Sequence, residues 1–96
     1  MKVYVITAYC DFEEYTPSVF KNKTEAEKRF KELILEEICN RESEFIDENN
    51  IERNFDDVTA FAKEEIPDIE IGTNYCQIGE PIDGGTHISM SEVELE

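Results

Sequence analysis

The chain has 96 residues and a formal net charge of −15, from 24 acidic and nine basic side chains. Its length predicts one domain with its own core, and a hydrophobic content of 40% with six Phe and four Tyr argues against intrinsic disorder. No segment is apolar enough for a membrane span or a signal sequence, and three widely spaced cysteines are typical of reduced thiols. We therefore expect a cytoplasmic protein that does not bind membranes.

The charge is divided unevenly along the chain. Residues 1–35 contain six acids and six bases, whereas residues 36–96 contain eighteen acids against Arg41, Arg53 and Lys63. Such asymmetry indicates a surface for a cationic partner. Direct nucleic-acid binding is not expected, because phosphates would be repelled. The lysines between residues 21 and 31 are interleaved with glutamates, which is typical of a solvated helix face.

The first forty residues predict a hairpin followed by a helix. Residues 3–8 are largely apolar at both alternating sets of positions, which predicts a central strand, and a turn is expected at residues 11–14. Pro17 cannot donate to a sheet ladder, so the strand over residues 15–20 is predicted at an edge. Asn22 fits a helix cap, so a helix should begin near Lys23.

This helix has two apolar stripes at a spacing of 100° per residue. The first contains Ala26, Phe30, Leu33 and Ile34, with Glu37 in its middle. The second is rotated by about 120° and consists of Ile34, Leu35, Ile38, Phe45 and Ile46. Either one helix presents two faces to different elements, or the helix breaks near residues 39–41.

The rest of the chain predicts a second helix and two or three strands. Asn54 caps a helix that Pro67 ends, and residues 69–71 form a short strand or a linker. Strands over residues 75–78 and 87–95 flank a glycine-containing loop. A bulge near Ser91 would return Val93 and Leu95 to the apolar face of the last strand.

Together these elements predict an α+β fold as a single domain over residues 1–96. The expected order is β-β-α-α-β-β, with an antiparallel sheet of about four strands, helices packed on one face, and the first strand beside the last.

The acidic helix surface is the candidate site. Five carboxylates fall within about 120° of arc over roughly 18 Å of helix, where they could engage a phosphate-binding protein surface in place of nucleic acid. The second helix extends this row. The simpler interpretation, a solvated face without function, remains open. The predicted partner-binding residues are Glu36, Glu37, Glu44, Asp47, Glu48, Glu52, Asp56, Asp57, Glu64 and Glu65.

Metal binding and catalysis find little support. Cys10, Cys39, Cys76 and His87 are zinc-ligand types, but they lack the close pairs of structural zinc sites. Residues 47–58 lack the glycine and the final glutamate of a calcium loop. No motif pairs a nucleophile with a base. We expect neither a cofactor nor a metal site, and no enzymatic activity.

Three segments are similar to small proteins of phages and mobile elements: the opening strand over residues 1–7, the strand-to-helix segment over residues 19–27, and the ending over residues 91–95. In size and acidity the chain resembles anti-CRISPR and antirestriction proteins that act as DNA mimics. This resemblance implies an inhibitor that binds a basic, nucleic-acid-binding protein. The alternatives are a self-associating assembly module, whose acidity serves solubility, and a small enzyme with a pocket around His87.

Overall fold

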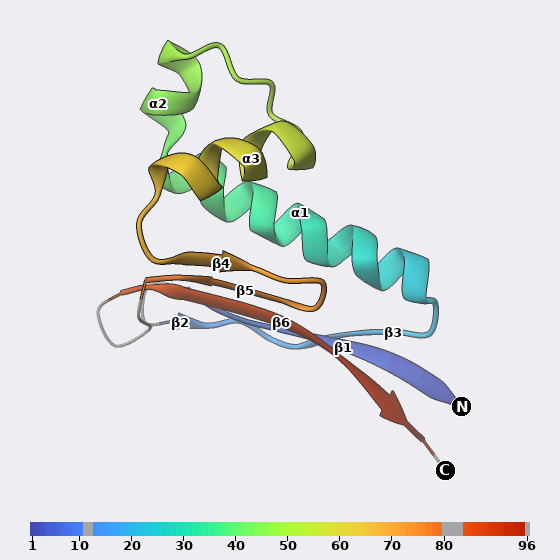
Figure 1. Cartoon of the computed structure of the whole chain (residues 1–96). Helices are drawn as coiled ribbons and strands as arrows, with labels where there is room; N and C mark the ends of the chain where they lie inside the picture. The colour runs from blue at the N-terminus through green and yellow to red at the C-terminus, as the bar shows by residue number, and fades with distance from the viewer. Residues whose placement is uncertain (11–12, 80–83, 96) are drawn as a thin grey trace.

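The computed structural model describes residues 1–10, 13–79 and 84–95. The fold is α+β: an antiparallel sheet of six strands with three helices over one face, which confirms the predicted class (Figure 1). The element order differs from the prediction, because the sequence analysis expected about four strands and two helices. The elements are β1 (Lys2–Cys10), β2 (Glu13–Glu14), β3 (Ser18–Phe20), α1 (Lys23–Arg41), α2 (Ser43–Glu48), α3 (Phe55–Glu65), β4 (Ile69–Ile71), β5 (Tyr75–Ile78) and β6 (Thr86–Glu94).

The sheet is organised around the long pair of β1 and β6. Its strand order is β2-β1-β6-β5-β4, and β3 also pairs with β1. The ladder between β1 and β6 runs without interruption from the pair Lys2–Glu94 to the pair Cys10–Thr86. The predicted pairing of the first and last strands is therefore confirmed, and the predicted bulge is wrong. Val93 faces away from the helices opposite Val3, where other valines provide apolar neighbours.

The edges of the sheet are short strands. β3 pairs with β1 from Tyr4–Phe20 to Ile6–Ser18, so the edge position predicted from Pro17 is confirmed. Glu13 and Glu14 were expected in a turn but form β2, while residues 11–12 of that expected turn lie outside the described residues. Short edge strands limit pairing with other chains.

Local capping residues determine where two of the helices begin. The Asn22 side chain accepts hydrogen bonds from the backbone N–H groups of Thr24 (2.8 Å) and Glu25 (3.2 Å), and Asn54 accepts one from Asp57 (2.8 Å). These bonds satisfy N–H groups that have no partner within the helix. Both predicted helix starts are thereby confirmed.

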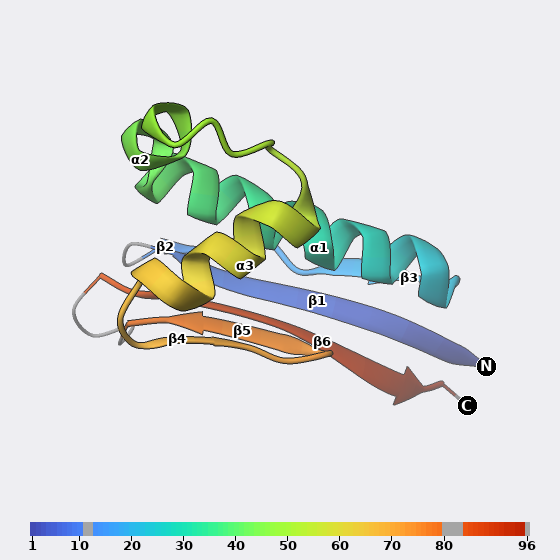
Figure 2. The same cartoon turned by 45° about the horizontal axis from the view of Figure 1, so that its top comes forward.

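The long helix predicted after Lys23 is interrupted at Glu42, so residues 23–66 contain three helices. This break lies one residue beyond the predicted range. It lets Ile46 turn into the core while Phe45 of the second predicted stripe is 52% exposed. In both views of the fold, α2 stands farthest from the sheet (Figures 1 and 2).

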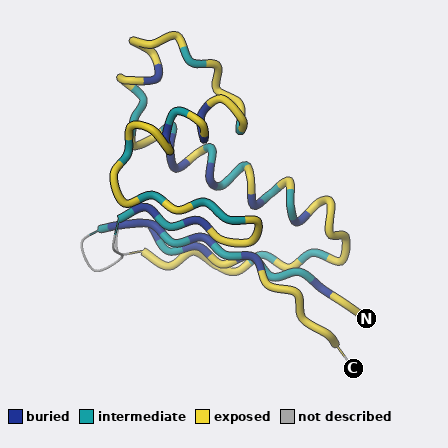
Figure 3. Tube along the Cα trace, in the orientation of Figure 1, coloured by how far each residue is buried: buried dark blue, intermediate teal, exposed yellow. Residues whose placement is uncertain are grey.

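The core lies between the helices and the sheet, where the buried segments face one another (Figure 3). Ile34 and Ile38 of α1 and Val58 of α3 are fully buried against Ile6 and Ile88 of the sheet. Each such side chain stabilises the fold by about 1.5–3 kcal/mol through burial. None of the helices within the described ranges combines the length and the apolarity needed to cross a membrane.

Candidate functional site

Nine of the ten predicted partner-binding carboxylates are exposed, and all nine lie in the helical layer. α1, α2 and α3 contribute eight of them, and the segment before α3 contributes Glu52. The structure thus brings most of the predicted residues to one layer. These nine residues, called the acidic layer below, are Glu36, Glu44, Asp47, Glu48, Glu52, Asp56, Asp57, Glu64 and Glu65.

Glu37 does not belong to this exposed layer, because only 9% of the residue is exposed. One of its carboxylate oxygens accepts hydrogen bonds from Arg41 Nε (2.7 Å) and from the Thr86 hydroxyl (2.7 Å). Arg41 also donates to the carbonyl oxygen of Gly84 (2.8 Å). Glu37 therefore links the end of α1 to the start of β6. Its place in the middle of the first apolar stripe was the sequence signal for this position.

The acidic layer is not the single row predicted from a continuous helix. The break at Glu42 changes the chain direction between Glu36 on α1 and the three carboxylates of α2. The helical projection used for the sequence therefore fails beyond residue 41. The nine carboxylates are instead distributed over α1, α2, α3 and the segment before α3.

Most of the negative charge in the acidic layer has no cation beside it. Asp47 lies 2.7 Å from the Arg53 guanidinium, and Glu36 lies 3.7 Å from that of Arg29. The hydrogen bond that Arg53 donates to the Asp47 carboxylate, together with the negative charge of that carboxylate, raises the pKa of Arg53. No lysine or arginine in the described part of the chain lies within 4.0 Å of the other seven carboxylates. The layer therefore presents uncompensated negative charge.

The helix dipole stabilises some carboxylates of the acidic layer and destabilises others. Asp56 and Asp57 lie in the first turn of α3, where the helix dipole favours negative charge. Glu64 and Glu65 lie in its last turn and Glu48 ends α2, where the dipole disfavours negative charge. Helix stability therefore does not explain these three glutamates.

The face of the sheet away from the helices has a different character. The residues that β1 and β6 present there are Val3, Val5, Thr7, Tyr9, His87, Ser89, Ser91 and Val93, which together with Val19 and Tyr75 are called the open face below. None of these ten residues is Asp, Glu, Lys or Arg. Val19 is 62%, Val93 39% and Tyr75 38% exposed.

A pocket of about 300 Å³ adjoins His87 on the open face and is also lined by Thr7, Tyr9, Glu14 and Tyr15. Within residues 1–10, 13–79 and 84–95, no hydrogen bond or ion pair engages the imidazole. The pocket is the concavity that the enzyme hypothesis predicted. It holds no nucleophile–base pair among the described side chains, so this hypothesis stays a prediction.

The cysteines and His87 do not come together as zinc ligands would. Cys10 and Cys76 face the helices and are buried, whereas His87 lies on the open face. Burial, with smaller contributions from Glu37 and Cys10, raises the pKa of the Cys76 thiol to about 11. Cys76 is therefore a protonated core residue. No group of three potential metal-ligating side chains occurs among the residues that are described.

Comparison with family models, with curated proteins and with solved structures finds no match for this chain. The function must therefore be argued from the surfaces themselves. Two of them differ sharply in charge: the acidic layer and the open face.

Proposed function

We propose that this chain is a non-enzymatic inhibitor that binds a basic, nucleic-acid-binding surface of a partner protein through the acidic layer. The observation that carries this proposal is the set of seven exposed carboxylates without a basic neighbour in the described residues. The similarity in size and charge to DNA-mimicking inhibitors points the same way.

The physical basis of recognition is replacement of phosphates by carboxylates. Each DNA strand presents phosphates about 3.4 Å apart, and proteins that bind them carry lysine and arginine at matching positions. Complementary charge accelerates association and makes affinity fall with salt. Carboxylates on α2, on α3 and between them can contact such a surface over two dimensions.

The test combines capture with competition. The tagged protein is used to capture binding partners from a cell lysate, which are eluted by a salt gradient and identified by mass spectrometry. Labelled duplex DNA is then bound to the captured partner and titrated with the protein, with fluorescence anisotropy as the readout. We expect the protein to displace the DNA, with affinity that decreases as salt increases.

Charge-reversal variants assign the surface. The triple variant Glu44→Lys, Glu48→Lys, Glu52→Lys removes three exposed, unpaired carboxylates of the acidic layer and should abolish displacement. The control Glu13→Lys, Glu14→Lys, Glu70→Lys changes the net charge equally on the exposed sheet edges and should retain it. Equal effects of the two variants, or a partner that DNA does not compete for, would contradict the proposal.

Self-association is the second candidate function, and the open face favours it. Val19 and Val93 expose apolar surface where no charge opposes contact between two copies. Val93→Lys would place a charge there. Light scattering after size exclusion should show a salt-insensitive oligomer that this variant converts to a monomer. A monomeric protein at all salt concentrations would exclude this function.

A further inference from the structure

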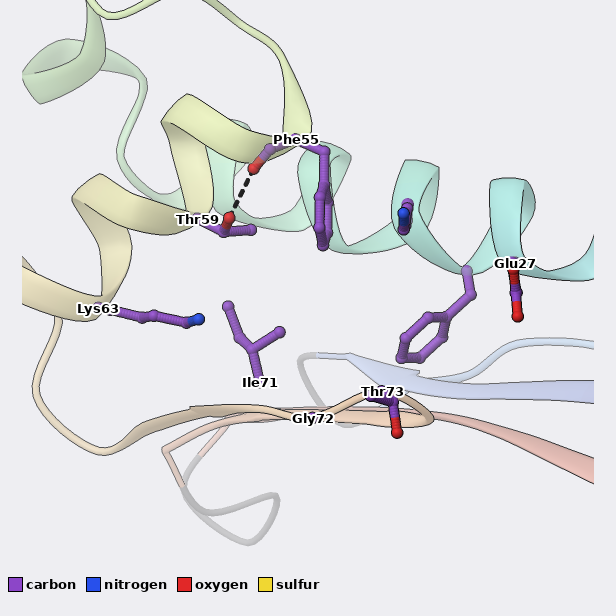
Figure 4. A pocket seen from close by; sticks show the side chains of 9 residues that line it. Glu27, Phe55, Thr59, Lys63, Ile71, Gly72 and Thr73 are labelled. Atoms are coloured by element: carbon purple, nitrogen blue, oxygen red, sulfur yellow. Dashed lines mark hydrogen bonds between the residues drawn. The ribbon is translucent and has the colours of Figure 1, made fainter.

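A pocket of about 440 Å³ lies between α1, α3 and the turn that joins β4 to β5 (Figure 4). Its volume is within the range of about 300–1,000 Å³ that is typical of small-molecule sites. It shares no residue with the acidic layer or with the open face. The pocket is therefore independent of the proposed function.

Helical periodicity builds two of its walls. Phe55, Thr59 and Lys63 follow one another at intervals of four residues, so α3 presents all three on one side. Phe30 and Lys31 come from the facing side of α1. Ile71 at the end of β4 closes the third side, and Figure 4 shows the Lys63 side chain extending toward it.

Phe30, Phe55 and Ile71 give the pocket an apolar lining, and Lys31 and Lys63 are its cationic side chains. Phe30 is buried, and Phe55 and Ile71 are half-buried. The Thr59 hydroxyl already donates to the carbonyl oxygen of Phe55 (2.6 Å), so it is not free to donate to a ligand (Figure 4). Lys31 Nζ lies 5.3 Å from the centre of the Phe55 ring.

Lys31 and Lys63 have no carboxylate partner among the described residues, although the protein has a net charge of −15. Glu27 also lines the pocket but pairs with Lys23 at 4.0 Å, and Figure 4 places it at the end opposite Lys63. Two ammonium groups without a carboxylate partner, in a pocket lined by two aromatic rings, match a ligand with one anionic end and an apolar body.

We propose that this pocket binds a small aliphatic carboxylate, with the carboxylate between Lys31 and Lys63 and the hydrocarbon chain against Phe30, Phe55 and Ile71. The two lysines supply charge-assisted hydrogen bonds, and the rings and Ile71 supply apolar contact. Glu27 disfavours a second negative charge at the far end.

Octanoate, octan-1-ol and octylammonium are suitable probes because they differ only in the polar end. Each is titrated into the protein to about 3 mM, below the aqueous solubility of octan-1-ol, at constant ionic strength, and binding is followed by backbone amide chemical shifts. We expect octanoate to shift the amides of Phe55, Thr59, Lys63 and Ile71. Octan-1-ol should bind at least fivefold more weakly, and octylammonium should not shift these amides.

Two lysine variants complete the test. Lys31→Gln with Lys63→Gln should weaken octanoate binding at least tenfold. Lys28→Gln changes an exposed lysine of α1 outside the pocket and should leave binding within twofold of the unmodified protein. The proposal is overturned if octanoate shifts no pocket amide, or if octan-1-ol or octylammonium binds as tightly as octanoate. It is also overturned if the double variant binds octanoate with the affinity of the unmodified protein.

Discussion

The two faces of this small protein contrast in charge and in the elements that build them. The helical layer carries the nine exposed carboxylates of the acidic layer, seven of them without a basic neighbour in the described residues, whereas the open face consists of valines, hydroxyl-bearing residues, tyrosines and one histidine. Glu14 and Glu70, which belong to the sheet, lie on its edge strands β2 and β4.

This contrast teaches that the net charge is a local property. The acidic layer is suited to a cationic partner, and the open face is suited to apolar contact. Both faces rest on the same core, which allows each to be perturbed separately.

The largest expected effect comes from the shared core. Ile34→Ala removes a fully buried side chain between the layers and should lower the free energy of unfolding by about 2–5 kcal/mol. Urea denaturation followed by helical circular dichroism and by tyrosine fluorescence should give coincident transitions. Val19→Ala on the open face should change stability by less than about 0.5 kcal/mol. Separate transitions for the two probes would show that the layers unfold independently.

The next effect concerns the link between α1 and β6. Arg41→Ala leaves the buried Glu37 carboxylate without its cation and should cost about 2–3 kcal/mol of stability, measured by urea denaturation. Adding Glu37→Gln should recover part of this loss, because no buried charge remains. Arg53→Ala, which breaks the exposed pair with Asp47, should have a much smaller effect. Equal losses for Arg41→Ala and Arg53→Ala would remove the structural role assigned to Glu37.

Alkaline pH distinguishes two neighbouring residues on opposite faces of β5. The native state keeps the Cys76 thiol protonated to about pH 11, whereas its ordinary pKa is 9.0. As the pH rises, the Cys76 thiol therefore loses its proton in the unfolded chain before it does so in the native state. The free energy of unfolding keeps its full value below pH 9 and decreases as the pH rises toward 11. The slope approaches at most about 1.4 kcal/mol per pH unit.

Urea denaturation between pH 8 and 11 measures this slope, which Cys76→Ala should reduce. On the open face, Glu70 raises the pKa of the Tyr75 hydroxyl through its charge and a hydrogen bond of 3.3 Å. Glu70→Gln should lower that pKa in an ultraviolet titration. An unaltered slope in Cys76→Ala would mean that the thiol is not protected by burial.

The smallest effect tests repulsion within the acidic layer. Glu44→Gln, Glu48→Gln and Glu52→Gln together should raise the melting temperature by a few degrees at low salt, because each removes an unpaired charge. The difference should vanish near 1 M salt, where the screening length is about 3 Å. Thermal unfolding of Glu13→Gln, Glu14→Gln, Glu70→Gln provides the control. An equal rise of the melting temperature in the control would mean that charge repulsion destabilises the whole protein uniformly and is not concentrated in the acidic layer.

Several parts of the fold could be predicted from local sequence. Asn22 and Asn54 fix helix starts through hydrogen bonds that span only two or three residues, and Pro17 indicates an edge strand because it lacks an N–H donor. The break at Glu42 could only be approximated, since neither proline nor glycine marks it. The bulge was predicted wrongly because strand alternation does not reveal that Val3 provides an apolar neighbour for Val93.

The candidate site shows the same limit. Exposure of most acidic residues followed from their positions on helices, but Glu37 turned inward because Arg41 and Thr86, the latter 49 residues away, satisfy its carboxylate. The sequence predicted that Lys31 lies on a solvated helix face, and it predicted no role for Lys63. No sequence pattern joins Lys31 to Lys63, since they line the same pocket only because α1 and α3 pack together.

The sequence by itself determined the uneven charge, the helix caps and the α+β class, because these follow from composition and short-range periodicity. Only the tertiary structure decided that Glu37 is buried, which residues form the open face, and that Lys31 and Lys63 line one pocket with Phe30 and Phe55. Those properties depend on contacts between residues far apart in the chain, and packing of the helices against the sheet creates them.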